Sequence, residues 1–120
     1  MQVKVDQDGY ITDYCIGGSI ADSVDVAQPE GFVQQQYRAY RLIDGALALD
    51  ADRLAALQLA DRQNAIRARR ERECYTIINR GQLWYEGVSI SHLVELRKWY
   101  KAWLDAPATL IIPDRPAWLD

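Results

Sequence analysis

The first 49 residues carry the alternation of apolar and polar positions that is typical of short β-strands. Val3 and Val5 fall on one face of a strand that begins at residue 2, and residues 10–16 form a second apolar-rich run. The pair Asp8-Gly9 separates the two runs, and Asp-Gly favours the tight turns that join antiparallel strands. We therefore predict a β-hairpin at the N-terminus.

A second hairpin is predicted from the same chemistry further along the chain. Residues 37–43 are rich in β-forming side chains, and Asp44-Gly45 separates them from residues 46–49. A short strand is expected at residues 23–26, whereas residues 32–36 fit either a helical turn or a loop. Together these elements predict an antiparallel sheet of four or five strands, which must pair further or pack on helices or another subunit.

Residues 50–80 predict one long polar helix. Asp50 or Asp52 can cap its first turn, and no Pro or Gly interrupts the stretch before Gly81. Its apolar stripe is thin, with Leu54, Leu57, Ala60 or Asp61, Asn64 or Ala65, and Ala68. Such a stripe fits either a solvated bridging helix or a weak coiled-coil strand, and the second interpretation predicts a homo-oligomer.

Residues 81–120 predict a helical unit closed by a proline-rich strap. All four tryptophans lie in this last third of the chain. Ser89 is placed to cap a helix with apolar side chains at Leu93, Leu96, Trp99 with Tyr100, and Trp103. We expect Pro107 to end this helix and the apolar tail to form an extended strap. Trp118 could either anchor this strap within the chain or insert into a partner, and the sequence favours neither. The expected fold class is therefore α+β, divided into segments 1–49, 50–80 and 81–120.

Composition narrows the function classes. Hydrophobic residues make up 49% and charged residues 26% of the 120-residue chain, which is ordinary for a folded domain. No apolar run reaches the ~20 residues of a membrane span, and the N-terminus lacks the pattern of a signal peptide. We therefore expect folding in the cytosol and no membrane partner. Cys15 and Cys74 lack metal-ligand spacing, which favours two buried free thiols over a disulfide.

Residue types that perform catalysis are sparse. His92 is the only histidine, and no nucleophile, phosphate-binding loop or metal-ligand motif surrounds it. We expect no catalytic residue, no metal and no cofactor, and hence a protein that is not an enzyme. An interaction surface could include exposed aromatic side chains, which contribute strongly to interface energies.

One basic segment supports an alternative function. Five arginines lie between Arg62 and Arg72, and a nucleic-acid-binding regulator could use such a helix. Asp61, Glu71 and Glu73 interrupt the segment, and the net charge of the chain is −3. This pattern favours solvated faces and ion pairs along the helix over nucleic-acid binding.

The C-terminal stretch carries a combination of short motifs that together resemble a known class of proteins. An arginine-rich helix leads into residues 77–81 and Leu83-Trp84-Tyr85, followed by a Ser-capped helix with Glu95-Leu96 and Trp99-Tyr100. The remaining motifs are Trp103-Leu104-Asp105, Pro107, Pro113, Pro116 and Trp118. This series resembles the small accessory proteins of tailed bacteriophages, including the tail-fibre assembly and tail assembly chaperone families.

The opening of the chain adds to the resemblance. Residues 3–6 with Asp8-Gly9-Tyr10-Ile11 are similar to the N-terminal hairpin of small tail-associated proteins from phages and prophages of Gram-positive hosts. Two positions depart from the pattern: His92 stands where Gln or Glu is usual, and Ala117 separates Pro116 from Trp118. The resemblance therefore leaves both an assembly chaperone and a structural virion component open.

The resemblance implies a non-enzymatic protein that binds a tail-fibre, receptor-binding or baseplate protein. It implies a location in the host cytoplasm during assembly or in the virion tail. The spacing favours core positions for Trp84, Trp99 and Trp103. The candidate partner-binding residues are nevertheless drawn from the same aromatic set, namely Trp84, Tyr85, Trp103 and Trp118.

Overall fold

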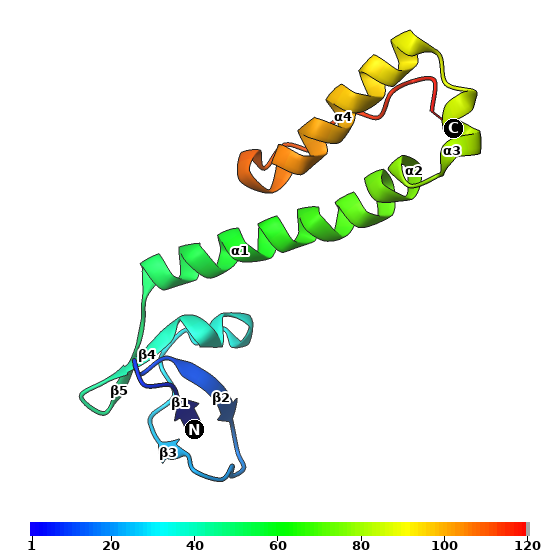
Figure 1. The fold of residues 1–120 in the computed structure, drawn as a ribbon. Coiled ribbons are helices and arrows are strands. Elements are labelled where there is room, and N and C mark those ends of the chain that lie inside the picture. Colours follow the sequence, from blue (N-terminus) through cyan, green and yellow to red (C-terminus); the bar gives the residue numbers. More distant parts are fainter. Residues whose placement is uncertain (120) are drawn as a thin grey trace. The chain divides into compact units, whose positions relative to one another are not determined.

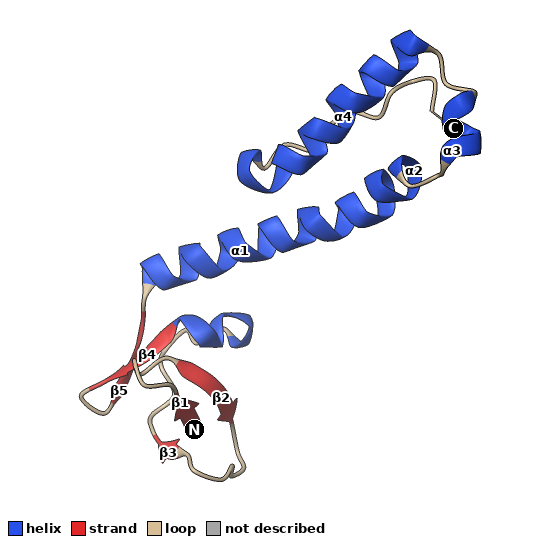
Figure 2. Ribbon diagram, in the orientation of Figure 1, coloured by secondary structure: helices blue, strands red, loops and turns tan. Residues whose placement is uncertain are grey.

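The computed structural model describes residues 1–119 and confirms the α+β class (Figures 1 and 2). The chain divides into two compact units, the first spanning Met1–Gln58 and the second beginning at Leu59. Unit 1 contains β1 Gln2–Val5, β2 Ile11–Cys15, β3 Val24–Asp25, a 3₁₀ helix Gln34–Ala39, β4 Tyr40–Ile43 and β5 Ala46–Leu49. The helices that follow are α1 Ala51–Arg70, a π-helical turn Glu71–Tyr75, α2 Thr76–Ile78, α3 Gln82–Glu86 and α4 Ile90–Thr109.

Both predicted hairpins are present, but they form two sheets instead of one. The first sheet has the antiparallel order β2-β1-β3, and the second contains β4 and β5 alone. A single bridge between Tyr10 and Arg41 joins them, beside a 2.7 Å hydrogen bond from the Leu42 amide to the Gly9 carbonyl. In the second hairpin Asp44 and Gly45 have φ angles of 50° and 81°, the turn geometry that Asp-Gly favours.

The expectation of a strand beginning at residue 37 is wrong. Tyr37 and Ala39 belong to the 3₁₀ helix, and the strand begins only at Tyr40. Tertiary packing explains the difference, because the Tyr37 ring lies 5.1 Å from the Tyr14 ring and Ala39 is fully buried. The core of unit 1 consists of Val3, Ile11, Val26 and Tyr40.

Tyr10 and Asp50 connect the first hairpin to the start of α1. The Tyr10 hydroxyl donates to Asp50 Oδ2 at 2.6 Å, and Asp50 Oδ1 accepts from the Arg53 amide at 3.0 Å, as a helix cap does. The guanidinium of Arg53 lies 4.4 Å from the centre of the Tyr10 ring. The Tyr10 hydrogen bond lowers the pKa of the Asp50 carboxyl, and the same bond raises the pKa of Tyr10.

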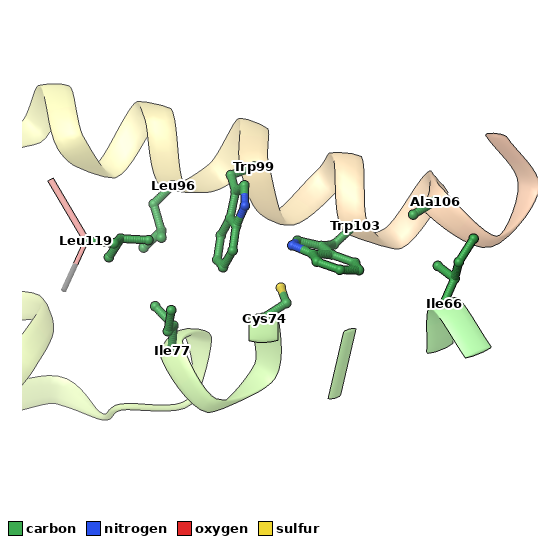
Figure 3. Packing of buried hydrophobic residues seen from close by; sticks show 8 residues of the cluster. All are labelled: Ile66, Cys74, Ile77, Leu96, Trp99, Trp103, Ala106 and Leu119. Carbon is green, nitrogen blue, oxygen red and sulfur yellow. The ribbon is translucent and has the colours of Figure 1, made fainter. Parts of the chain in front are cut away.

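The core of unit 2 lies between α4 and the segment that contains the π-helical turn. Figure 3 shows Trp99 and Trp103 projecting from α4 toward Cys74 and Ile77. Trp103 is 2% exposed, and Cys74 is fully buried. Burial raises the pKa of the Cys74 thiol to about 11. Cys15 and Cys74 are both free, as expected, but Cys15 is only partly buried, which corrects that part of the prediction.

The apolar stripe predicted for α1 is only partly confirmed. Its second half is exposed, at Ala60, Asp61, Asn64, Ala65 and Ala68, and the buried Ile66 lies outside the predicted stripe. Ile66 is the buried residue of α1, whereas Leu54 and Leu57 are partly buried and Leu59 is 44% exposed. Helical structure continues from α1 through the π-helical turn into α2 and ends at Ile78. The helix predicted for residues 50–80 is therefore present, although one π-helical turn interrupts its α-helical geometry.

Pro107 does not end α4, contrary to expectation. The helix continues to Thr109 and is closed by Leu110, which has a left-handed φ of 60° and donates its amide to the Ala106 carbonyl at 2.7 Å. A proline at position 107 leaves the Trp103 carbonyl without its usual amide donor. Arg70 Nη1 lies 3.5 Å from that oxygen and donates to it. This substitute donor explains why the last turn tolerates proline.

Candidate partner-binding groove

The chain after α4 returns alongside that helix toward α3, as the red segment of Figure 1 shows. Trp118 anchors the returning segment. Its indole Nε1–H donates to Glu95 Oε2 at 2.7 Å, and its ring stacks on His92 with centroids 4.3 Å apart and planes 2° apart. Leu119 is 8% exposed and belongs to the core of unit 2. The expected strap is therefore present, and Trp118 anchors it within the chain.

A shallow hollow of about 480 Å³ lies beside this anchor. Residues from α3, the connection to α4, the first turn of α4 and the tail contribute to it. Its lining consists of Leu83, Trp84, Gly87, Val88, His92, Trp118 and Leu119. We call these seven residues the aromatic groove. Concave apolar surfaces with a few polar groups are the usual form of binding sites.

Short-range structure positions the walls of the groove. The His92 amide donates to the side chain of Ser89 at 3.2 Å, which confirms Ser89 as the N-cap of α4. This cap places His92 in the first turn, where its ring meets Trp118. On the other wall, Trp84 stacks on Trp118 at 6.4 Å, and the Arg80 guanidinium lies 5.1 Å from the Trp84 ring.

One wall of the groove is an exposed apolar side chain. Leu83, which lines the groove, is 86% exposed. Isolated surface leucines are common, but here one adjoins partly buried tryptophans and a concave surface. The combination gives this end of unit 2 an apolar surface that a second molecule could cover.

Three of the four predicted partner-binding residues gather here. Trp84 and Trp118 line the groove, and the Tyr85 ring packs against Trp84 at 5.0 Å. The Tyr85 hydroxyl points inward, because it donates to the Ile78 carbonyl at 2.6 Å, and burial raises its pKa. Trp103 is the exception, since it is 2% exposed in the core between α4 and Cys74. Its selection as a contact residue is corrected, and its interpretation as a core residue is confirmed.

Sequence reasoning missed two important groove residues. The sequence placed His92 near the start of a helix without assigning it a binding role, and no apolar periodicity marked Leu83 as a contact residue. Trp118 lies 26 positions after His92 in the chain, so only the return of the tail brings the two rings together. The sole available signal was local: the Ser89 cap places His92 and Glu95 on neighbouring turns of one helix face.

The arginine segment offers a weaker surface for binding nucleic acid. Arg69 forms an ion pair with Glu73 at 2.6 Å, and this bond raises the pKa of Arg69 and lowers that of Glu73. Arg67 donates to Asn64 at 2.9 Å, and Arg70 turns toward Trp103. Three of the five guanidinium groups therefore have partners within the chain.

Within residues 1–119, no three residues among His, Cys, Asp and Glu lie close enough to hold a metal ion. None of the helices in the described part of the chain is long and apolar enough to cross a membrane. A second open hollow of about 450 Å³ lies along the π-helical turn and α2, lined by Glu71, Tyr75, Thr76 and Asn79.

A match to a known family falls in unit 1. Residues 1–53 match the model of a family described as a protein of unknown function, DUF2977. The matched segment contains both hairpins and ends in the first turn of α1, so it includes Tyr10, Asp50 and Arg53. No curated protein and no solved structure matches the chain. The aromatic groove lies outside the matched segment.

Proposed function

We propose that this chain is a non-enzymatic, tail-associated protein of a bacteriophage or prophage. It binds a tail-fibre, receptor-binding or baseplate protein, either as an assembly chaperone in the host cytoplasm or as a structural component of the tail. The resemblance of the C-terminal motifs to phage accessory proteins supports the biological setting. The observation that carries the binding role is the aromatic groove, whose lining residue Leu83 is 86% exposed.

The groove is suited to an apolar side chain of a protein partner. Trp84 and Trp118 are held by contacts within the chain, so little side-chain entropy is lost when a partner covers them. Rigid aromatic side chains surrounded by apolar area are the usual centres of interface energy. His92 lines the groove and Arg80 lies beside Trp84, and the polar groups of both can orient the bound segment.

The test is light scattering of the purified full chain, alone and mixed with the products of adjacent tail genes. The expected result is a complex of defined mass with one of these proteins. Leu83→Asp should abolish the complex, because it places a charge in an apolar contact. Leu104→Asp is the matched control, since Leu104 is an exposed apolar residue of α4 that does not line the groove.

Two results would overturn the proposal. One is the absence of a complex with every adjacent tail protein while the chain remains folded. The other is a complex that Leu83→Asp and Leu104→Asp weaken equally, which would place the contact elsewhere. Retention on heparin that falls steeply with salt would instead support the nucleic-acid-binding alternative through residues 62–72.

A further inference from the structure

The β4–β5 hairpin has an edge strand, β5, that is paired on one side only within the sheets of unit 1. β5 is a run of four apolar residues, Ala46–Leu49, and its only strand partner in the described chain is β4. Natural proteins usually protect such edges with charge, proline or a covering element. β5 carries no charged residue and no proline. β4 is bridged to the first sheet at Tyr10 and Arg41, whereas β5 has no second strand partner in the described chain, so its outer edge is open to pairing.

The register determines which backbone groups face outward. The two-residue turn makes Ile43 and Ala46 the first hydrogen-bonded pair, and such pairs alternate along the hairpin with pairs that are not hydrogen-bonded. The amides and carbonyls of Leu47 and Leu49 therefore point away from β4. The same alternation turns the Leu42 amide away from β5, where it donates to Gly9 at 2.7 Å. That observed bond supports the assignment of the outward groups.

We propose that β5 pairs antiparallel with β5 of a second copy of this chain, which joins two hairpins into one four-stranded sheet. In the register that pairs the outward backbone groups, Leu47 lies opposite Leu49 of the second copy. By the two-fold symmetry, Leu49 lies opposite Leu47 of the second copy. This register uses all the outward amides and carbonyls of both leucines. Ala48 then lies on the axis, opposite its own copy, in a pair that is not hydrogen-bonded.

The chemistry of the edge favours a second copy as the partner. A strand without charges pairs best with another uncharged apolar strand, and a second copy supplies one in a register that satisfies both edges. Ala48 is small and exposed, so two copies can approach closely on the axis. Leu49 is 45% exposed, and the added strand would cover part of this apolar surface.

The segment shared with the DUF2977 family includes β5 and ends before unit 2. Pairing through β5 would therefore be a property of the matched segment, and it does not depend on the tail partner proposed for the groove.

Cross-linking across the axis tests the register directly. In a full-length chain with Cys15→Ser, Ala48→Cys should form an intermolecular disulfide under mild oxidation, because the two Cα atoms would lie about 4.5 Å apart. Ala46→Cys is the matched control on the same exposed face. In the dimer, the Cα atoms of residue 46 in the two chains would be separated by about 13 Å along the strands, which is too far for a disulfide. Equal cross-linking at both positions, or none at Ala48→Cys, would overturn the proposal.

Sedimentation equilibrium provides a second test that needs no cross-link. The unmodified chain should have the mass of two chains at high concentration. Ala48→Lys should raise the dissociation constant about fivefold, because it places like charges opposite each other. Ala48→Thr, which adds a side chain without charge, should dimerise about fivefold more tightly than Ala48→Lys. A monomer at every concentration, or a dimer that Ala48→Lys leaves unchanged, would refute pairing through β5.

Discussion

The indole Nε1–H of Trp118 donates to Glu95 Oε2 at 2.7 Å, which joins two residues 23 positions apart in the chain. Glu95 lies in α4 and Trp118 in the returning tail, so this bond holds the tail against the helix. The same indole ring stacks on His92 and on Trp84. One side chain therefore closes unit 2 and forms part of its candidate binding surface.

The bond between Trp118 and Glu95 should be measurable as a coupling energy. Trp118→Phe retains an aromatic ring but removes the N–H donor, and Glu95→Ala removes the acceptor. In a double-mutant cycle of the free energy of unfolding, we expect a coupling of about 1 kcal/mol, the usual net value of a hydrogen bond. Additive effects of the two changes would show that the bond does not stabilise the tail.

The core position of Trp103 predicts a large loss of stability on truncation. Trp103→Ala should lower the free energy of unfolding of unit 2 by about 3–5 kcal/mol, because it removes a buried indole and leaves a cavity. Leu104→Ala, at a site 43% exposed, should cost less than about 1 kcal/mol. Tryptophan fluorescence during denaturant unfolding reports unit 2 alone, since all four tryptophans follow residue 83.

The contact between Asp50 and Tyr10 predicts an acid-dependent contribution to stability. The pKa of Asp50 is lowered in the folded chain, first by the Tyr10 hydrogen bond, so its carboxylate stabilises the fold above the ordinary pKa of 3.8. That contribution is lost as the pH falls through the folded-state pKa. Asp50→Asn should therefore lower the melting temperature at pH 7, and the difference should shrink at progressively lower pH.

The control for this pH experiment is Asp61→Asn, a change at an exposed position of α1 outside the cap. It should leave the melting temperature nearly unchanged over the same pH range. Thermal unfolding followed by circular dichroism measures all three proteins. A difference between wild type and Asp50→Asn that stays constant down to pH 2 would contradict the assignment to the Asp50 carboxylate.

The two thiols should differ sharply in reactivity. Cys74 is fully buried and its thiol has a pKa of about 11, so only ~0.1% of it would be thiolate at pH 8. A thiol reagent should therefore modify the partly buried Cys15 first and reach Cys74 only when unit 2 unfolds. Cys15→Ser should remove the early phase of the reaction. Two thiols that react at equal rates in the native protein would contradict the buried position of Cys74.

Local chemistry made several elements predictable. Asp44-Gly45 specifies its hairpin because the turn needs two residues that tolerate positive φ, and Ser89 specifies the start of α4 because its side chain satisfies a free amide. Neither inference depends on distant residues. The prediction that Pro107 ends α4 was wrong because it ignored a distant residue. Arg70, which replaces the missing amide donor of Pro107, is 33 positions from the accepting carbonyl of Trp103.

The candidate site was likewise predictable only in part from the sequence. Aromatic clustering in the last third of the chain pointed to Trp84, Tyr85 and Trp118, but it selected Trp103 equally well. Periodicity alone cannot separate a buried indole from one at a groove, because both lie on the apolar side of a helical unit. The packing of α4 on Cys74 and Ile77 buries Trp103, whereas the return of the tail leaves Trp84 and Trp118 at the surface.

The sequence by itself determined the α+β class, the two Asp-Gly hairpins and the long polar helix, because these follow from turns, caps and periodic apolar positions. It left Trp118 open between an anchor within the chain and a contact with a partner. Only the tertiary structure decided how the strands divide into two sheets, where α4 ends, and which aromatic side chains meet at the groove. Those features depend on contacts between residues far apart in the chain, whose loop-closure and packing energies no local pattern encodes.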